Sequence, residues 1–205
     1  MHDRRADGDL DLDRTLDRWN GSWPPAAEDL VTRRWTGARR AVCLLVDSSG
    51  SMEGLAVAIA AVAAAGVVLA ADERLQTSVL TFSGTVEVLQ AHGQRRPAEE
   101  LVGRLVGLRG HGVTDLAAAL RGARRQLLPA VADERVVVLL SDCLHTTGDP
   151  PESALAGIDR LHVLCPLPSP EAEEAARALA ARGAGIALPV RTVTEVGPTL
   201  TRLLG

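Results

Sequence analysis

The sequence predicts an α/β fold, a doubly wound and mostly parallel sheet of six strands with one antiparallel edge strand. From Ala41 onward, short apolar runs alternate with Ala-rich helical segments. Strands separated by helices imply right-handed βαβ crossovers, with helices on both faces of the sheet. A single hairpin, in which Ser83-Gly84 joins two strand-like runs, implies one antiparallel strand. Hydrophobic residues make up 46% of the chain, enough for a sizeable core.

The expected elements follow one another along the chain. Residues 41–46 (AVCLLV) form a continuous apolar run that suits a central parallel strand, and residues 135–141 form a second one. The hairpin takes residues 77–82 and 85–90. The other expected elements are helices near 54–72, 97–108, 116–128, 151–158, 170–182 and 195–204, and strands at 161–165 and 185–190.

The first 40 residues differ in composition from the rest. All three Trp residues of the chain (Trp19, Trp23 and Trp35) lie there, and a single Phe is the only other aromatic residue. We therefore expect residues 1–40 to be an N-terminal arm, or lead-in, that packs on a domain formed by residues 41–205. The Trp residues are interpreted as an apolar clamp that holds the arm on the domain; the alternative is an exposed surface for a partner.

Composition and charge exclude several classes of protein. A net charge of -4 and an isoelectric point near 5.7 argue against a nucleic-acid binder. All 22 basic residues are Arg, so the chain has no P-loop lysine and no lysine for Schiff-base chemistry. The N-terminus lacks the apolar segment of a signal peptide. Three Cys residues without paired spacing are typical of reduced thiols, and we expect a cytoplasmic protein.

One long uncharged stretch, Leu55 to Ala71, needs to be tested as a membrane span. It is at the short limit for crossing a bilayer and is rich in Ala. Its flanks fit a βα unit, so we interpret it as a buried helix and expect no membrane span.

Acidic and hydroxyl residues follow the two central strands. Asp47 comes directly after the first apolar run, Asp142 comes after the second, and Thr114 lies in a glycine-rich loop that leads into a helix. Ligands of open α/β sheets bind at the carboxyl ends of the strands, so these loops converge if the two strands are neighbours. Ser49 and Ser51 can point the same way as Asp47, because alternate side chains of an extended turn share a face. Oxygen ligands of this kind predict a hard cation: Mg²⁺, Mn²⁺ or Ca²⁺.

The run DSSGS (residues 47–51) after an apolar strand resembles the DxSxS motif of von Willebrand factor A (VWA) domains. Thr114 and Asp142 match the other two loops of that family's metal-ion-dependent adhesion site (MIDAS), and the match covers about residues 41–205. The resemblance implies a Rossmann-like VWA fold with sheet order 3-2-1-4-5-6, and a partner's Asp or Glu at an open metal position. It also implies a Mg²⁺ coordinated by Ser49, Ser51 and Thr114, with Asp47 and Asp142 binding directly or through water.

The N-terminal region carries a second resemblance. The segment GDLDLDRTLDR, followed by an Arg-rich lead-in, is similar to the segment before the VWA domain in magnesium-chelatase D subunits. It also resembles bacterial VWA proteins that work with MoxR-type AAA+ ATPases. The resemblance implies that the ATPase is a separate chain. The long acidic and proline-rich linker of a chelatase D subunit is absent, which favours a stand-alone relative or a fragment of a longer chain.

The predicted ligands also have a purely structural interpretation. Ser, Thr and Asp are good N-caps, so Ser51 could open the first helix and Thr114 the helix at 116–128. Asp115 is interpreted as a first-turn acid that faces the helix dipole rather than as a ligand. Five matching positions in order favour the metal site over isolated caps.

Nearby His and Cys residues could suggest other chemistry. We expect His111 and His145 to be solvated loop residues rather than metal ligands or general bases. Cys143 and His145 have a C-x-H spacing, but no second pair completes a zinc site. Cys43 and Cys165 are interpreted as buried strand residues.

Three functions are compatible with these residues. The favoured one is a non-enzymatic adaptor that binds an acidic residue of its partner through Mg²⁺, in a AAA+ ATPase or chelatase-like system. The alternative is a Mg²⁺-dependent hydrolase or phosphatase-like enzyme, but Ser49 stands where such phosphatases have a second carboxylate, and no GxSxG motif is present. The third is a structural VWA scaffold that binds metal for stability alone.

Overall fold

The chain divides into two units, Met1–Gly37 and Ala38–Gly205, and each is described by itself. In the computed structural model of the protein, the described residues are 9–10, 12–19, 21–24, 30, 32–33, 39–50, 52, 54–72, 74–107, 112–166 and 168–204.

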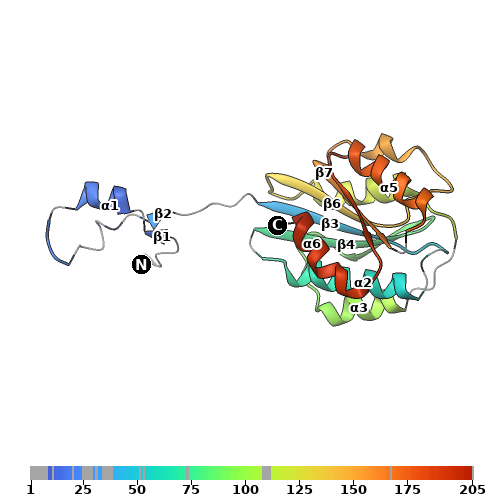
Figure 1. Ribbon diagram of the computed structural model, residues 1–205, viewed down its shortest axis with the longest axis horizontal. Helices are drawn as coiled ribbons and strands as arrows, with labels where there is room; N and C mark the ends of the chain where they lie inside the picture. Colours follow the sequence, from blue (N-terminus) through green and yellow to red (C-terminus); the bar gives the residue numbers. More distant parts are fainter. Residues whose placement is uncertain are drawn as a thin grey trace. The chain divides into compact units, whose positions relative to one another are not determined.

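In the smaller unit, the described residues form two short strands and one helix. Strands β1 (Asp9–Leu10) and β2 (Thr32–Arg33) pair antiparallel, and the helix α1 (Leu12–Arg18) lies between them in sequence (Figure 1). Trp23 is 84% exposed, and Trp35 lies outside the described residues. The packing of the N-terminal arm on the domain stays a prediction.

The larger unit is built on six strands: β3 (Arg40–Asp47), β4 (Leu75–Phe82), β5 (Val86–Gln90), β6 (Glu134–Leu140), β7 (Arg160–Pro166) and β8 (Ala187–Val190). Their order in the sheet is β5-β4-β3-β6-β7-β8, and only β5 pairs antiparallel. Counted within this unit, the order is 3-2-1-4-5-6. The predicted doubly wound sheet with one antiparallel edge strand is confirmed.

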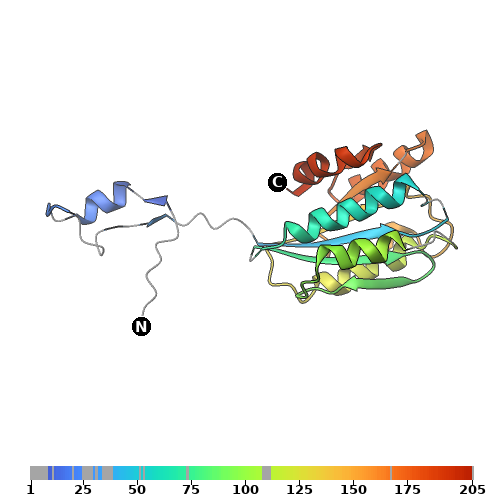
Figure 2. The ribbon, with the colours of Figure 1, turned by 90° about the horizontal axis from the view of Figure 1, so that it is seen from below.

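Helices cover both faces of the sheet, as Figures 1 and 2 show. On one face lie α2 (Leu55–Leu69), α3 (Ala98–Val106) and α6 (Val196–Leu204). On the other lie α4 (Leu116–Leu127) and α5 (Pro170–Arg182). No helix of the described part of the chain is long and apolar enough to cross a membrane.

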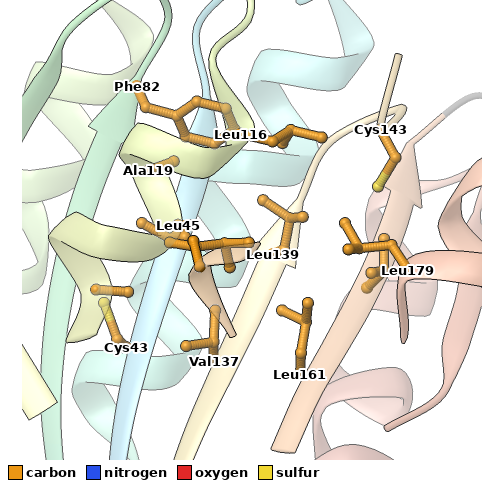
Figure 3. Close-up of a cluster of buried hydrophobic side chains, with 14 of the residues drawn as sticks. Cys43, Leu45, Phe82, Leu116, Ala119, Val137, Leu139, Cys143, Leu161 and Leu179 are labelled. Atoms are coloured by element: carbon orange, nitrogen blue, oxygen red, sulfur yellow. The ribbon is translucent and has the colours of Figure 1, made fainter. Parts of the chain in front are cut away.

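The central position of strand β3 in the sheet explains why its sequence is continuously apolar. Successive side chains point to opposite faces, and here both faces are covered, so every position from Ala41 to Val46 is buried. Figure 3 shows one of the two resulting clusters, in which Leu45 packs beside Leu139 of β6. On the α4/α5 side β3 contributes Ala41, Cys43 and Leu45, and on the α2/α3/α6 side Val42, Leu44 and Val46.

Two expected elements differ from the structure. The helix expected at 151–158 is shorter than predicted: only the 3₁₀ helix η1 (Pro151–Ala154) forms, and Gly157, with a positive φ of 83°, lies outside helical geometry. The strand expected from Gly185 begins later, at Ala187. A Cβ at Gly185 would lie 2.0 Å from the Leu161 carbonyl oxygen, so the chain passes too close to β7 for another residue there.

Candidate metal-binding loops

Asp47, the last residue of β3, is the most constrained of the predicted ligands. It is 1% exposed, and both of its carboxylate oxygens accept hydrogen bonds. The Ser49 backbone N–H donates to Oδ1 over 2.8 Å, and the Ser141 hydroxyl donates to Oδ2 over 2.6 Å. These bonds fix the orientation of the carboxylate at the carboxyl end of the sheet.

The electrostatics of Asp47 favour a compensating cation. Burial raises the pKa of this carboxyl above its ordinary value, and the negative charge of Asp142 raises it further, although hydrogen bonds from Ser141 and Ser49 act in the opposite direction. A buried carboxylate is costly unless it is paired or bound to a metal. A cation at this edge would therefore relieve the cost of both carboxylates.

The loop after β3 is tied to the neighbouring strand. Both the backbone N–H and the hydroxyl of Ser48 donate to the Phe82 carbonyl, over 2.7 and 2.9 Å. The Met52 N–H donates to the Ser49 carbonyl over 3.0 Å, which closes a turn around the buried Ser49. Ser51, the second serine of the motif, lies outside the described residues.

Thr114 is buried in the loop before α4. Its N–H donates to the Thr146 hydroxyl over 2.9 Å, and its carbonyl accepts from the N–H groups of Thr146 and Thr147. The interpretation of Thr114 as the N-cap of α4 is wrong: Asp115 is the cap, and its carboxylate accepts from the Ala118 N–H over 2.8 Å. The Thr114 hydroxyl is therefore not used as a helix cap.

Asp142 follows β6 in a strained turn. Its side chain is half-buried, and its Oδ1 accepts from the Leu144 N–H over 3.0 Å. Cys143 adopts a φ of 59°, which is unusual outside glycine, and its N–H donates to the Ser141 hydroxyl over 3.0 Å. His145 is exposed, as expected of a solvated loop residue. The turn holds Asp142 at the edge where Asp47 ends.

The three loops converge at one edge of the sheet. Strands β3 and β6 are parallel neighbours, which places Asp47 and Asp142 at the same end. The Thr114 loop is bonded to the loop after β6, and the Asp115 N–H donates to the Ser83 carbonyl just after β4 over 3.0 Å. Within the described residues, no three His, Cys, Asp or Glu side chains gather as a metal site. The candidate ligands are thus two carboxylates and neutral hydroxyls.

Two positions important to this geometry were not among the predicted site residues. Ser141 binds the Asp47 carboxylate, and Thr146 joins the loop of Thr114 to the loop after β6. A hydroxyl residue directly before the strand-end Asp142 was the available signal for Ser141. His111 lies outside the described residues.

The three cysteines are free and buried. Burial raises the pKa of the Cys43 thiol to about 12 and that of Cys165 to about 11, and the pKa of Cys143 is also raised. Buried, protonated thiols are poor metal ligands and poor nucleophiles.

A family model described as "VWA domain containing CoxE-like protein" matches residues 1–200. No curated protein sequence matches the chain significantly.

Solved structures share the fold at low sequence identity. An aerotolerance-related membrane protein from Bacteroides fragilis is 18% identical, with a TM-score of 0.62 over 80% of this chain and 97% of its own. A von Willebrand factor type A protein from Catenulispora acidiphila is 15% identical, with a TM-score of 0.66 over 84% of this chain and 43% of its own. Proximal thread matrix protein 1 from the mussel byssus, described with a zinc-occupied MIDAS motif, is 14% identical, with a TM-score of 0.63 over 82% of this chain and 47% of its own.

Proposed function

The chain belongs to the family of CoxE-like proteins that contain a VWA domain, and from this premise we propose that it is a metal-dependent protein-binding module. The cation is Mg²⁺, with Mn²⁺ or Ca²⁺ as substitutes, because all candidate ligands are oxygens. When bound, the cation supplies an electrophilic position for a carboxylate oxygen of a partner. The residues that hold it are Asp47, Ser49, Ser51, Thr114 and Asp142.

The observation that carries this proposal is the buried Asp47 beside a second carboxylate. Asp47 is 1% exposed, and Asp142 adds repulsion rather than compensation. No described Arg forms an ion pair with either group. A divalent cation is the simplest compensation that uses the neighbouring hydroxyls as well.

The chain's own residues orient the ligands. Ser141 and the Ser49 N–H fix the Asp47 carboxylate, and the bonds between Thr114 and Thr146 fix the second loop. Two carboxylates only balance the charge of a divalent cation and the other candidate ligands are neutral hydroxyls, so an open coordination position can still take one more carboxylate oxygen. The acidic side chain of an Asp or Glu on a partner protein meets that requirement.

Protein binding fits this edge better than catalysis. VWA domains are generally non-catalytic interaction modules. The cavity beneath Asp47, bordered by Met52 and Leu105, measures about 10 Å³, on the order of one water molecule. A carboxylate ligand that approaches this end of the sheet from outside needs no deep pocket.

The proposed setting is a cytoplasmic AAA+ system. The 205 residues contain no Lys and hence no P-loop lysine, so these residues do not supply a P-loop ATPase; an ATPase of the MoxR type is the proposed source of ATP-driven work. In that arrangement the module presents an acidic target, or the ATPase itself, through the metal. This proposal rests on the resemblance of the N-terminal segment and of the VWA domain.

The test is capture of partners from native cytosol with Mg²⁺ or with EDTA. We compare the wild type with Asp47→Ala and Asp142→Ala, and use Glu174→Ala, an exposed acid on α5, as the matched control. Circular dichroism verifies that each variant is folded. We expect a protein retained only with Mg²⁺, by the wild type and Glu174→Ala.

Capture that is unaffected by EDTA and by both Asp variants would overturn the proposal. A metal-dependent rise in melting temperature without any metal-dependent partner would favour the structural scaffold instead.

A further inference from the structure

A polar cavity lies at the end of the sheet opposite to the candidate metal loops. It measures about 210 Å³ and lies where β3, β6 and β7 begin, beside the end of α6. The charged or titratable residues that line it are Arg40, Glu134, Arg160, His162 and Arg202.

The lining carries an excess of positive charge. The single carboxylate, Glu134, pairs with the Nε atoms of both Arg40 and Arg160, over 3.0 and 2.5 Å. Within the described residues, Arg202 forms no ion pair, and the terminal nitrogens of Arg160 have no acceptor. The Arg160 side chain is 56% exposed. Arg160 shares the Glu134 carboxylate with Arg40, and Arg202 has no described carboxylate partner, so an anion is the ligand that would balance Arg160 and Arg202.

His162 adds a directed donor to this lining. It is 5% exposed, and its Nδ1 accepts the Ile186 N–H over 3.2 Å. The proton of the neutral imidazole is therefore on Nε2. Burial and the nearby Arg160 lower the pKa of His162, which favours this neutral form. No described residue accepts a hydrogen bond from Nε2, which leaves this N–H for a ligand in the cavity.

The volume limits the size of the ligand. A water molecule occupies about 30 Å³ in the liquid, so 210 Å³ is too large for one water. Pockets for drug-sized ligands measure roughly 300–1,000 Å³. A small anion fits between these limits, and guanidinium groups bind planar or tetrahedral oxyanions through paired N–H donors.

We propose that this cavity is a binding site for a small oxyanion, a phosphate or carboxylate group, held by Arg160, Arg202 and the Nε2–H of His162. Glu134 keeps the Arg160 side chain at the cavity mouth without neutralising the whole lining. The site is independent of the candidate metal site, because it is built at the other end of the strands.

The experiment is an NMR titration of the full chain after its metal is removed with a chelating resin. The imidazole signals of His162 are followed at constant ionic strength, with inorganic phosphate in one arm and succinate in the other. We expect a saturable shift of the His162 signals in at least one arm. Arg202→Gln, on the exposed side of α6, should weaken binding about tenfold.

Arg125→Gln is the matched control, since Arg125 is an exposed arginine on α4 that does not line the cavity. Its affinity should equal that of the wild type. The arm that saturates at lower concentration identifies the ligand chemistry as phosphate or carboxylate. The absence of a saturable shift in both arms, or an equal affinity in Arg202→Gln and the wild type, overturns the proposal. Metal-free protein makes either result independent of the proposed metal-dependent function.

Discussion

The two ends of strand β3 carry opposite chemistry. The strand begins at Arg40, in the basic cavity, and ends at Asp47, among carboxylates and hydroxyls. At about 3.3 Å per residue, these ends lie roughly 23 Å apart, beyond the Debye length of about 8–10 Å at physiological salt. The apolar stretch between them separates two charged ends of the sheet, for which we propose ligands of opposite sign.

The two edges also differ in how they balance their charge. Asp47 is 1% exposed and forms no ion pair with a described cationic side chain, whereas Arg160 and Glu134 pair with each other near solvent. Desolvated charge is costly, while exposed pairs contribute little to stability. We therefore expect the carboxyl end of the sheet, where Asp47 lies, to depend on the proposed bound ion, and the amino end, where Arg40 lies, not to depend on one.

The largest expected effect on stability comes from a substitution in the hydrophobic core between the two ends of the sheet. Leu139→Ala removes a buried side chain from the centre of β6 (Figure 3) and should lower the free energy of unfolding by about 2–5 kcal/mol. Leu128→Ala, at an exposed position just after α4, should change it by less than about 0.5 kcal/mol. Urea unfolding measures both changes in the free energy of unfolding, and equal changes would show that the core around Leu139 is not packed as described.

A smaller effect is expected from the hydroxyl that supports Asp47. Ser141→Ala removes the donor to Asp47 Oδ2 and the acceptor of the Cys143 N–H. This variant should lower the free energy of unfolding by about 1–3 kcal/mol and weaken metal binding. Ser48→Ala removes only a bond to the Phe82 carbonyl, which keeps its backbone donor. Ser48→Ala should therefore cost less and leave the metal affinity unchanged. Thermal unfolding with and without Mg²⁺ distinguishes the two variants.

The ion pairs of the amino edge should contribute less. Glu134→Gln breaks two partly exposed pairs and should cost about 1 kcal/mol, while raising the affinity of the cavity for phosphate. Glu100→Gln, in the exposed i,i+4 pair with Arg96, should lower the free energy of unfolding by a few tenths of a kcal/mol and leave the phosphate affinity unchanged. A lower phosphate affinity in Glu134→Gln would contradict the charge balance described for this edge.

The smallest effect concerns the three buried thiols. Because burial raises the pKa of Cys43 to about 12, its thiolate fraction in the native state keeps rising with pH well above the ordinary thiol range. Alkylation by iodoacetamide at pH 8, followed by mass spectrometry, should be slow for Cys43 and Cys165. Cys143, beside Asp142, should react sooner without metal than with Mg²⁺, and all three should react rapidly in urea. A native Cys43 that reacts as fast as in urea would exclude this burial.

The strands of the sheet could be predicted from the sequence because their signals are local, whereas their order was implied by the resemblance to VWA domains. Continuous apolar runs marked β3 and β6, and the turn at Ser83-Gly84 marked the antiparallel strand. The positions of Asp47 and Asp142 at one edge followed from those strands being neighbours.

The helix cap of α4 and the basic cavity could not be predicted, because they depend on contacts between segments that are distant in the sequence. That Asp115 rather than Thr114 caps α4 is set by the bonds of Thr114 to Thr146. The basic cavity combines residues of β3, β6, β7 and α6, and no local pattern brings Arg40, Arg160 and Arg202 together.

The central claim is that the carboxyl edge holds one divalent cation. The most direct measurement is a titration of the resin-treated chain with Mn²⁺, in which electron paramagnetic resonance reports the free ion. We predict one bound Mn²⁺ per chain, displaced by Mg²⁺, retained in Glu174→Ala and lost in Asp47→Ala. A wild type that binds no Mn²⁺, or an Asp47→Ala chain that binds it as tightly as the wild type, would contradict the claim.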